Sequence, residues 1–281
     1  MVTHTGFKIR RIVITVILMF LGITMLLPLI WMISSSFKIE GFIFSYPIQW
    51  IPNKTTFTFQ NWIDLFNVKN YSVPRFYLNS IILAAGTIIG RFFFGSLAAF
   101  GFSRYNFPGR DKLFLLYLAT IMIPFEVLII PQYILLRHLK LIDTLLSIIL
   151  LGSFDAYSVF LLRQYFLSIP RSLQDAAVID GAKPFVIYSQ IIIPLARPAF
   201  ASLGIITLVG VWNDYMKSLI FLNSPKNFPI VIGVLVFHQH YNLRFGPIMA
   251  AATISVFPLL IIFLIFQKEF VKGFMTVGIK G

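Results

Sequence analysis

Six long apolar segments constrain this chain more than any other feature of its sequence. Each holds about 20 mostly apolar residues, and at 1.5 Å per residue of helix this length crosses about 30 Å of hydrocarbon. The sequence therefore predicts an all-α membrane protein with six transmembrane helices. These segments cover residues 12–33, 76–102, 113–136, 141–162, 199–222 and 248–266.

The composition also indicates a membrane protein. Of the 281 residues, 58% are hydrophobic and 12% are charged, whereas soluble domains are close to half apolar and a quarter charged. The net charge of +13 does not indicate nucleic acid binding, because the basic residues cluster between the apolar segments, where they control topology and meet anionic headgroups. The chain contains no Cys, which excludes disulfides and Cys-based metal sites.

The first apolar segment follows Lys8, Arg10 and Arg11, so a signal peptide has to be considered. The segment is longer than a signal h-region and no A-x-A-like site follows it, so we interpret it as an uncleaved first span. Counts of Lys and Arg then set the orientation. With the N-terminus inside, 13 basic residues lie on the cytoplasmic side and 9 lie outside, while Arg91 lies within a span. This bias predicts that both termini are cytoplasmic.

One water-facing stretch, "LQDAAVIDGAKPFVIYSQIIIPLARP" (173–198), interrupts the apolar pattern between the fourth and fifth segments. Ser172 and Asp175 form an S-x-x-D capping box, which predicts the start of a helix. Gly181 predicts its end, with a left-handed backbone, and Pro184 predicts the first residue of a second short helix. On the residues alone, an ordinary interfacial loop with solvated charges remains the alternative.

The same stretch resembles the EAA loop of permease subunits of ATP-binding-cassette (ABC) importers. That loop reads E-A-A, three residues, Gly, nine residues, then I-x-L-P; the chain keeps this spacing, with Asp175 in place of Glu and Ile193 in place of Leu. "AAVIDGAKP" is similar to the form found in carbohydrate-type importers. The resemblance implies a coupling helix that docks on an ATPase subunit. The coupling residues it implies are Asp175, Ala176, Ala177, Asp180, Gly181, Ala182, Ile191 and Pro194.

Further motifs extend the resemblance over roughly residues 75–281. They are "FYLNSIILA" (76–84), "AAFGFSRYNFPGRDKLF" (98–114), "IMIPFEVLIIPQYILL" (121–136), "WNDY" (212–215) and "VKGFMTVGIKG" (271–281). They look like the smaller permease subunit of maltose-type systems. This resemblance implies a type I ABC importer permease fold in a prokaryotic cytoplasmic membrane, which moves a carbohydrate, by family default an oligosaccharide, by alternating access. An acidic saccharide or glycerol phosphate is the alternative solute.

The resemblance also implies the partners. They are a second homologous permease subunit, two ABC ATPase subunits, an extracytoplasmic solute-binding protein and membrane lipid, and not nucleic acid. No cofactor is expected in this chain, since ATP and Mg²⁺ would bind the ATPase subunits, and the chain itself would not be an enzyme. The sequence has no G-x-x-x-x-G-K-[ST], H-E-x-x-H or G-x-S-x-G motif.

These expectations divide the chain into successive parts. They are a cytoplasmic N-terminus (1–11), a first transmembrane helix (12–33), an extracytoplasmic loop (34–75), a core of five transmembrane helices (76–270) that includes the coupling loop (163–198), and a cytoplasmic tail (271–281). The glycines of the tail argue against a regular helix there, and the resemblance implies that the tail contacts the ATPase pair.

Ionisable side chains inside predicted spans are candidates for the translocation path, because such groups usually face a bundle interior or a cavity. Glu126 lies between Pro124 and Pro131, and prolines free the backbone carbonyls that line broken helices; an interfacial residue that reaches water is the alternative. Asn213 and Asp214 lie in the outer half of the fifth span, with an ordinary polar helix end as the alternative.

Two other features carry weaker signals. Arg91 lies in the second span near Gly86 and Gly90, a G-x-x-x-G pattern that predicts tight helix packing. Arg91 pairs either with a group of the partner subunit or with a carboxylate in a structural ion pair. We interpret His238 and His240 as loop histidines and expect no metal site, since no third ligand is in view.

Two other classes of protein stay open on the residues alone. One is an intramembrane enzyme that uses Glu126, Asp155 or Asp214 as its acids or bases, and the other is a membrane scaffold or simple channel. The coupling-loop pattern favours the importer permease, because neither alternative requires an acidic helix followed by a glycine at that spacing.

Overall fold

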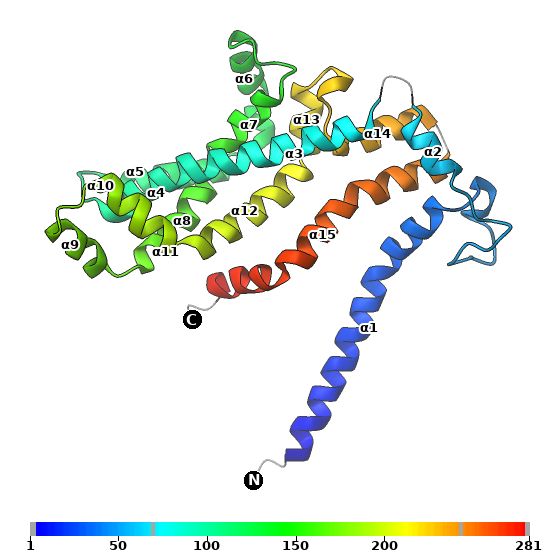
Figure 1. Cartoon of the computed structure of the whole chain (residues 1–281), viewed down its shortest axis with the longest axis horizontal. Coiled ribbons are helices and arrows are strands. Elements are labelled where there is room, and N and C mark those ends of the chain that lie inside the picture. Colours follow the sequence, from blue (N-terminus) through cyan, green and yellow to red (C-terminus); the bar gives the residue numbers. More distant parts are fainter. Residues whose placement is uncertain (1–3, 69–70, 242–243, 279–281) are drawn as a thin grey trace. The chain divides into compact units, whose positions relative to one another are not determined.

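The computed structural model describes residues 4–68, 71–241 and 244–278, which are mostly helical (Figure 1). Within these ranges no β-strand forms, and the β contact is an isolated antiparallel bridge between Lys38 and Phe57. The all-α prediction is therefore confirmed. The chain divides into two compact units, which are Met1–Asn70 with Gly233–Phe257, and Tyr71–Ile232 with Pro258–Gly281.

Helices of very different length follow one another along the chain. The α-helices are α1 (His4–Ser36), α2 (Gln60–Phe66), α3 (Val73–Gly90), α4 (Ser96–Arg104), α5 (Arg110–Ala119), α6 (Phe125–His138), α7 (Leu145–Ser153), α8 (Ala156–Ser168), α9 (Arg171–Ile179), α10 (Pro184–Val186), α11 (Ile193–Leu195), α12 (Arg197–Trp212), α13 (Tyr215–Phe221), α14 (Ile230–Tyr241) and α15 (Phe245–Gly278). The π-helices are η2 (Arg91–Gly95) and η4 (Ile187–Ile192). The 3-10 helices are η1 (Glu40–Phe42), η3 (Thr120–Met122) and η5 (Pro225–Asn227).

Three helices are each long and apolar enough to cross a membrane. They are Arg10–Ser36, Val73–Arg104 and Phe245–Gln267. Three pairs of shorter helices reach that length only together. The pairs bend by 100° between Arg110–Met122 and Phe125–His138, by 43° between Leu145–Ser153 and Ala156–Ser168, and by 74° between Pro184–Leu195 and Arg197–Trp212. The described part of the chain thus has three unbroken candidate spans, or six if each bent pair is one span.

The breaks divide the predicted spans 113–136, 141–162 and 199–222 into shorter helices. Pro124 forces the residue before it into an extended conformation, which ends η3. Asp155 caps α8, because its carboxylate accepts hydrogen bonds from the backbone N–H (2.9 Å) and hydroxyl (2.7 Å) of Ser158. Asp214 caps α13 in the same way through the N–H of Lys217 at 3.1 Å. In each case one residue with a local backbone preference interrupts an apolar run.

Some helical stretches were not expected from the sequence. Helices α2 and α14 lie where loops were predicted, and both are too short to stand out as membrane spans. Helix α15 continues to Gly278, so the expectation of no regular helix after residue 271 is wrong up to that residue. A glycine inside a helix costs about 1 kcal/mol and does not by itself end it.

In the first unit, hydrogen bonds join the segment after α1 to α2 and to the start of α15. The side-chain amide of Asn61 donates to the carbonyl oxygens of Ser36 (3.0 Å) and Lys38 (2.8 Å). The carboxylate of Glu40 accepts from the first two backbone N–H groups of α15, at 2.6 and 2.8 Å. A Cβ on Gly246 would lie 2.3 Å from the Asn61 side-chain oxygen, so a glycine is required at this start of α15.

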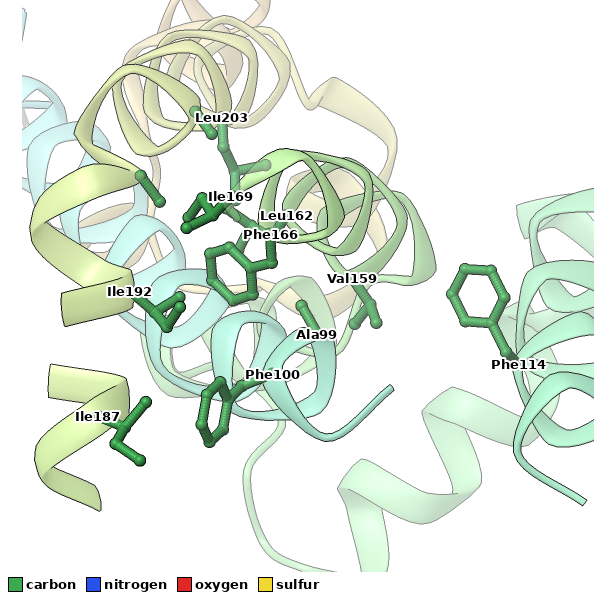
Figure 2. Packing of buried hydrophobic residues seen from close by; sticks show 12 residues of the cluster. Ala99, Phe100, Phe114, Val159, Leu162, Phe166, Ile169, Ile187, Ile192 and Leu203 are labelled. Atoms are coloured by element: carbon green, nitrogen blue, oxygen red, sulfur yellow. The ribbon is translucent and has the colours of Figure 1, made fainter. Parts of the chain in front are cut away.

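The apolar core of the second unit joins five helical elements (Figure 2). It includes Ala99 and Phe100 of α4, Phe114 of α5, Val159, Leu162 and Phe166 of α8, Ile187 and Ile192 of η4, and Leu203 of α12. All of these side chains are buried. Because η4 contributes to this core, the segment after α9 is a packed part of the bundle and not a solvated loop.

A seam of glycines brings α3 against α7. A Cβ added at Gly86 or Gly90 would lie 2.7 Å from Ile149 Cδ1 or 2.0 Å from Ser153 Oγ. From the opposite side, a Cβ at Gly152 would lie 2.8 Å from a side-chain methyl of α3. The tight packing predicted from the G-x-x-x-G pattern is confirmed.

Asp143 ties the loop before α7 to the loop after α13. Its carboxylate accepts from the backbone N–H groups of Asn223 and Ser224, both at 2.9 Å, and from the Ser224 hydroxyl. The side-chain amide of Asn227 donates to the same carboxylate at 3.3 Å. Burial by itself raises the pKa of Asp143, but the hydrogen bonds from Ser224, Asn223 and Asn227 outweigh it and lower the pKa to about 2.

Candidate functional site

The helix pair α9–α11 turns sharply at Gly181. Its N–H donates to the carbonyl of Val178 (3.0 Å), and the next N–H, that of Ala182, donates to Ala177 (2.8 Å). These two bonds, with φ +80° at Gly181, form a Schellman motif. The left-handed backbone predicted for Gly181 is confirmed, and its requirement for glycine is local.

The start of α9 differs from the prediction. The helix begins at Arg171, two residues earlier than an N-cap at Ser172 implies, and Pro170 occupies the N-cap position without a side-chain capping bond. The proposed capping box of Ser172 and Asp175 is therefore wrong, because both residues lie inside the helix. Asp175 is exposed there, so its carboxylate is not engaged in closing the first turn.

The second helix of the pair begins at Pro184, as predicted, after an extended Lys183. It passes into η4, where the hydroxyl of Tyr188 lies 2.6 Å from Ser96 Oγ of α4. The Tyr188 ring also lies 5.3 Å from that of Phe100. These contacts fix the pair against α4.

The helix pair has an inner and an outer face. Of the sequence-predicted coupling residues, those packed against the apolar core are Ala177, Ala182 and Ile191. Those that are exposed are Asp175, Ala176, Asp180, Gly181 and Pro194. The outer face also carries large apolar side chains, which are Val178 (56% exposed), Ile179 (85%) and Phe185 (70%). An acidic surface with exposed apolar side chains beside it is suited to binding another protein.

Arg104 anchors this helix pair, and the sequence reasoning missed it. Its side chain is buried, and its guanidinium donates to the carbonyl oxygens of Phe166 and Ile169 at the end of α8. Pro170 and α9 follow immediately. The C-terminal residue of α4 is therefore hydrogen-bonded to the backbone that immediately precedes α9. The one sequence feature that could have indicated this contact is the position of a basic residue at the predicted cytoplasmic end of the span 76–102.

Arg91 forms an ion pair within the chain. Its guanidinium lies 3.4 Å from Asp155 Oδ2 and donates to Gly152 O (2.8 Å) and Thr207 Oγ1 (3.3 Å). The interpretation of Arg91 as a structural ion pair is supported by these contacts. The helix is wound as a π-helix over Arg91–Gly95, a local change that often marks functional positions.

The residues predicted for the translocation path do not all meet. Asp214 accepts a hydrogen bond from Lys217 Nζ at 2.6 Å and lines a cavity of about 150 Å³ together with Arg91. Asn213 is exposed and donates to Val209 O (2.9 Å), and Glu126 is exposed in the first turn of α6; neither lines this cavity.

The histidine pair is only partly described by the structure. His238 is exposed at the end of α14, and the side chain of His240 lies outside the described residues. Among the residues that are described, no group of three His, Asp or Glu side chains could hold a metal ion.

Comparison with known proteins assigns the family. The family model of the binding-protein-dependent transport system inner membrane component matches residues 91–275. The chain is 32% identical to the arabinooligosaccharides transport system permease protein AraQ of Bacillus subtilis, over 98% of both chains. It is 34% identical to the sn-glycerol-3-phosphate transport system permease protein UgpE of Agrobacterium fabrum, over 73% of this chain and 74% of UgpE.

A solved structure shows the same fold. It is the crystal structure of a bacterial ABC transporter involved in the import of the acidic polysaccharide alginate, with a TM-score of 0.84 at 22% identity, covering 96% of this chain and 99% of that one. With the family match over residues 91–275, the chain belongs to the inner membrane components of binding-protein-dependent transport systems, which are the membrane permeases of ABC importers and not the subunits that hydrolyse ATP.

Proposed function

We propose that this chain helps to form the translocation path for an oligosaccharide and works by alternating access, coupled to ATPase subunits through residues 172–194. The similarity to AraQ over nearly the full length supports an oligosaccharide as the solute. UgpE and the alginate transporter supply the alternatives, glycerol phosphate and an acidic saccharide.

In this proposal the chain crosses a prokaryotic cytoplasmic membrane six times, with both termini cytoplasmic. Three unbroken spans and three bent pairs support the six crossings. The parts would be the cytoplasmic N-terminus, the first transmembrane helix, an extracytoplasmic loop, the permease core with its coupling loop, and a cytoplasmic tail. The bounds would be 1–11, 12–33, 34–75, 76–270 (coupling loop 163–198) and 271–281.

The partners would be a second permease subunit, two ABC ATPase subunits and an extracytoplasmic solute-binding protein. The family description supports the last of these. ATP and Mg²⁺ would bind the ATPases, and no cofactor would bind this chain. ATP-driven closure of the ATPases would move the coupling helices and rock the bundles between inward-open and outward-open states.

The observation that carries the coupling role is the outer face of α9. Asp175, Ala176 and Asp180 are exposed, while Ala177 on the opposite side packs into the core. The acidic side chains can pair with basic residues of an ATPase, and the small Ala176 permits close approach. Arg104 of α4 donates to two carbonyl oxygens just before this helix. A displacement of α9 would therefore be transmitted to α4.

Glu126, Asn213 and Asp214 stay our candidates for the translocation path. Each lies within two residues of a helix break, at Pro124 or between α12 and α13. Broken helices near the middle of a transporter often bind its solute.

Disulfide cross-linking tests the coupling role, since the chain has no Cys. We expect Ala176→Cys to cross-link to cysteines introduced along the docking cleft of the co-expressed ATPase. The matched control is Ala177→Cys, the neighbouring residue on the inner face, which should not cross-link. Equal cross-linking of both variants, or of neither, would contradict docking through this face.

The solute is tested separately, with the solute-binding protein that is encoded with this chain. We expect neutral oligosaccharides to raise the thermal unfolding midpoint of that protein. A rise caused only by glycerol 3-phosphate or by uronate oligosaccharides would replace the oligosaccharide by one of the alternatives.

A further inference from the structure

In the first unit, the chain that follows α1 folds back onto the end of that helix. The hydroxyl of Ser34, in the last turn of α1, donates to the carbonyl oxygen of Trp50. The ammonium group of Lys38, two residues after α1, donates to the carbonyl oxygen of Gln49. The segment between these contacts and the next turn, residues 41–53, is called the α1 loop below. Both of its ends are therefore fixed beside the C-terminal turn of α1.

A ring contact sets the depth of the α1 loop relative to α1. If α1 crosses the membrane as proposed, Arg11 marks the inner end of its apolar stretch, and about 20 residues of helix cross the hydrocarbon. Trp31 lies 20 positions after Arg11, and so at the outer boundary, where Trp and Tyr are enriched. The ring of Phe44 lies 5.5 Å from the ring of Trp31. The α1 loop is thus at the level of this boundary and does not extend far into water.

The exposed surface of the α1 loop is apolar and uncharged. Its sequence, "GFIFSYPIQWIPN", holds no Asp, Glu, Lys or Arg. Of the charged residues just before it, Lys38 is buried and Glu40 binds the first N–H groups of α15. The large side chains that it exposes are those of Phe42, Phe44, Ile48, Trp50, Tyr46 (95% exposed) and Ile51 (81%). Such a surface is unfavourable in water, and it carries no charge that could pair with a soluble protein.

We infer that the α1 loop inserts into the outer leaflet of the membrane, at the boundary between the acyl chains and the headgroups. Tyr46 and Trp50 have apolar rings with one polar atom each, which suits this boundary, and Ile48 and Ile51 would contact acyl chains. The loop continues the apolar surface of α1, where Ile30 is also exposed. Its contact with lipid needs no particular headgroup, because the loop is uncharged. The inference rests on the proposed crossing of the membrane by α1 and not on the solute.

Spin labelling of the assembled importer in nanodiscs tests this inference. The chain has no Cys, so Tyr46→Cys and Ile51→Cys each carry one label once the cysteines of the partner subunits are replaced. Oxygen collides with labels in acyl chains, whereas nickel ethylenediaminediacetate stays in water. We expect the ratio of oxygen to nickel collisions to be several-fold higher at both positions than at the control, Lys54→Cys. Lys54 is exposed and lies three residues after Ile51. Ile48→Cys is a further reporter should either variant fail to assemble.

Two results would overturn the inference. If the labels at positions 46 and 51 collide with nickel as often as the label at position 54, the α1 loop lies in water. If they are shielded from both oxygen and nickel, a protein surface covers the loop, either that of the second permease or that of the solute-binding protein. Nanodiscs of phosphatidylcholine alone and nanodiscs with added phosphatidylglycerol should give the same ratio. Insertion only with phosphatidylglycerol would contradict a contact that depends on apolar side chains.

Met25→Cys separates a failure of this inference from a failure of the proposed topology. Met25 is an exposed residue of α1 between Arg11 and Trp31, so nickel should not reach a label there, whether lipid or the second permease covers the helix. Nickel collisions at Met25 as frequent as those at Lys54 would contradict the crossing by α1. Exclusion of nickel at Met25, with free access at positions 46 and 51, would contradict the insertion of the α1 loop alone.

Discussion

The helix pair α9–α11 and the cavity around Arg91 both place charged side chains in a chain dominated by apolar residues, but they hold them differently. On α9 the carboxylate of Asp175 is exposed, as is that of Asp180 at the C-cap, while the inner face of the helix is packed. In the cavity each charge faces an opposite charge of the same chain. The first arrangement leaves charge available to another protein. The second neutralises the charges within the chain.

The largest effect is expected for Arg91→Met. It leaves the carboxylate of Asp155 part-buried without its cation, and removal of one partner of a buried pair costs about 3–5 kcal/mol. We expect a lower thermal unfolding midpoint of the purified complex. The double variant Arg91→Met with Asp155→Asn should recover part of the loss, since the amide oxygen can still cap α8. If Arg91→Met were as stable as the unmodified chain, the pairing of Arg91 with Asp155 would not stabilise the fold, and the contrast with α9 would be wrong.

Gly181→Pro should disrupt the helix pair. Proline cannot adopt φ +80° and lacks the N–H that donates to Val178, so we expect a cost of about 3 kcal/mol or more at this turn. The variant should still insert into the membrane, but uptake and solute-stimulated ATPase activity should be lost. Gly181→Asn, which tolerates a left-handed backbone, should keep most of both. Normal stimulation and uptake in the proline variant would contradict the coupling role.

Asp143 adds a third case to the comparison. Within the described part of the chain its carboxylate is stabilised by hydrogen bonds and not by a cation. Its pKa in the folded chain, about 2, lies below the ordinary value of 3.8. The hydrogen bonds to the ionised Asp143 therefore stabilise the folded chain fully at pH values above its ordinary pKa of 3.8. This stabilisation is lost as the pH falls towards 2. Asp143→Ala should destabilise the complex by about 2 kcal/mol at neutral pH, as for hydrogen bonds to charged groups. The difference from the unmodified chain should shrink between about pH 4 and pH 2; a constant difference would show that the charge is not involved.

The smallest effect is expected for Asp175→Lys. Exposed ion pairs contribute about 0–1 kcal/mol, so the thermal stability of the chain should not change while the yield of co-purified ATPase falls. An acidic substitution on the ATPase residue that faces it should restore part of the yield. An unchanged yield of ATPase would mean that Asp175 faces no basic group.

Sequence reasoning reached the features that a few neighbouring residues determine. Gly181 and Pro184 set local backbone conformations, and both were predicted. The capping box failed for an equally local reason, since Pro170 already starts the helix. Apolar segments were found, but hydropathy over about 20 residues hides single breaks such as those at Asp155 and Asp214.

The cavity could not be predicted, because its contacts join distant parts of the chain. Arg91 and Thr207 are 116 positions apart, and no local pattern pairs them. No local sequence pattern marks Thr87 or Lys217 as lining it either. Arg104 was counted only as a charge that sets orientation, although its contacts lie 62 and 65 residues away.

We expect the unbroken helix from Val73 to Arg104 to make this permease sensitive to the thickness of its membrane. Its 32 residues correspond to roughly 48 Å of helix, compared with about 30 Å of hydrocarbon. The excess is accommodated by tilt or by projection of its ends into the headgroup layers. Arg104, at one end of this helix, donates to the carbonyl of Ile169 just before α9. A change in the tilt of the helix would therefore shift α9. Lipids with longer or shorter acyl chains would thereby bias the importer towards one of its two states without binding to any site.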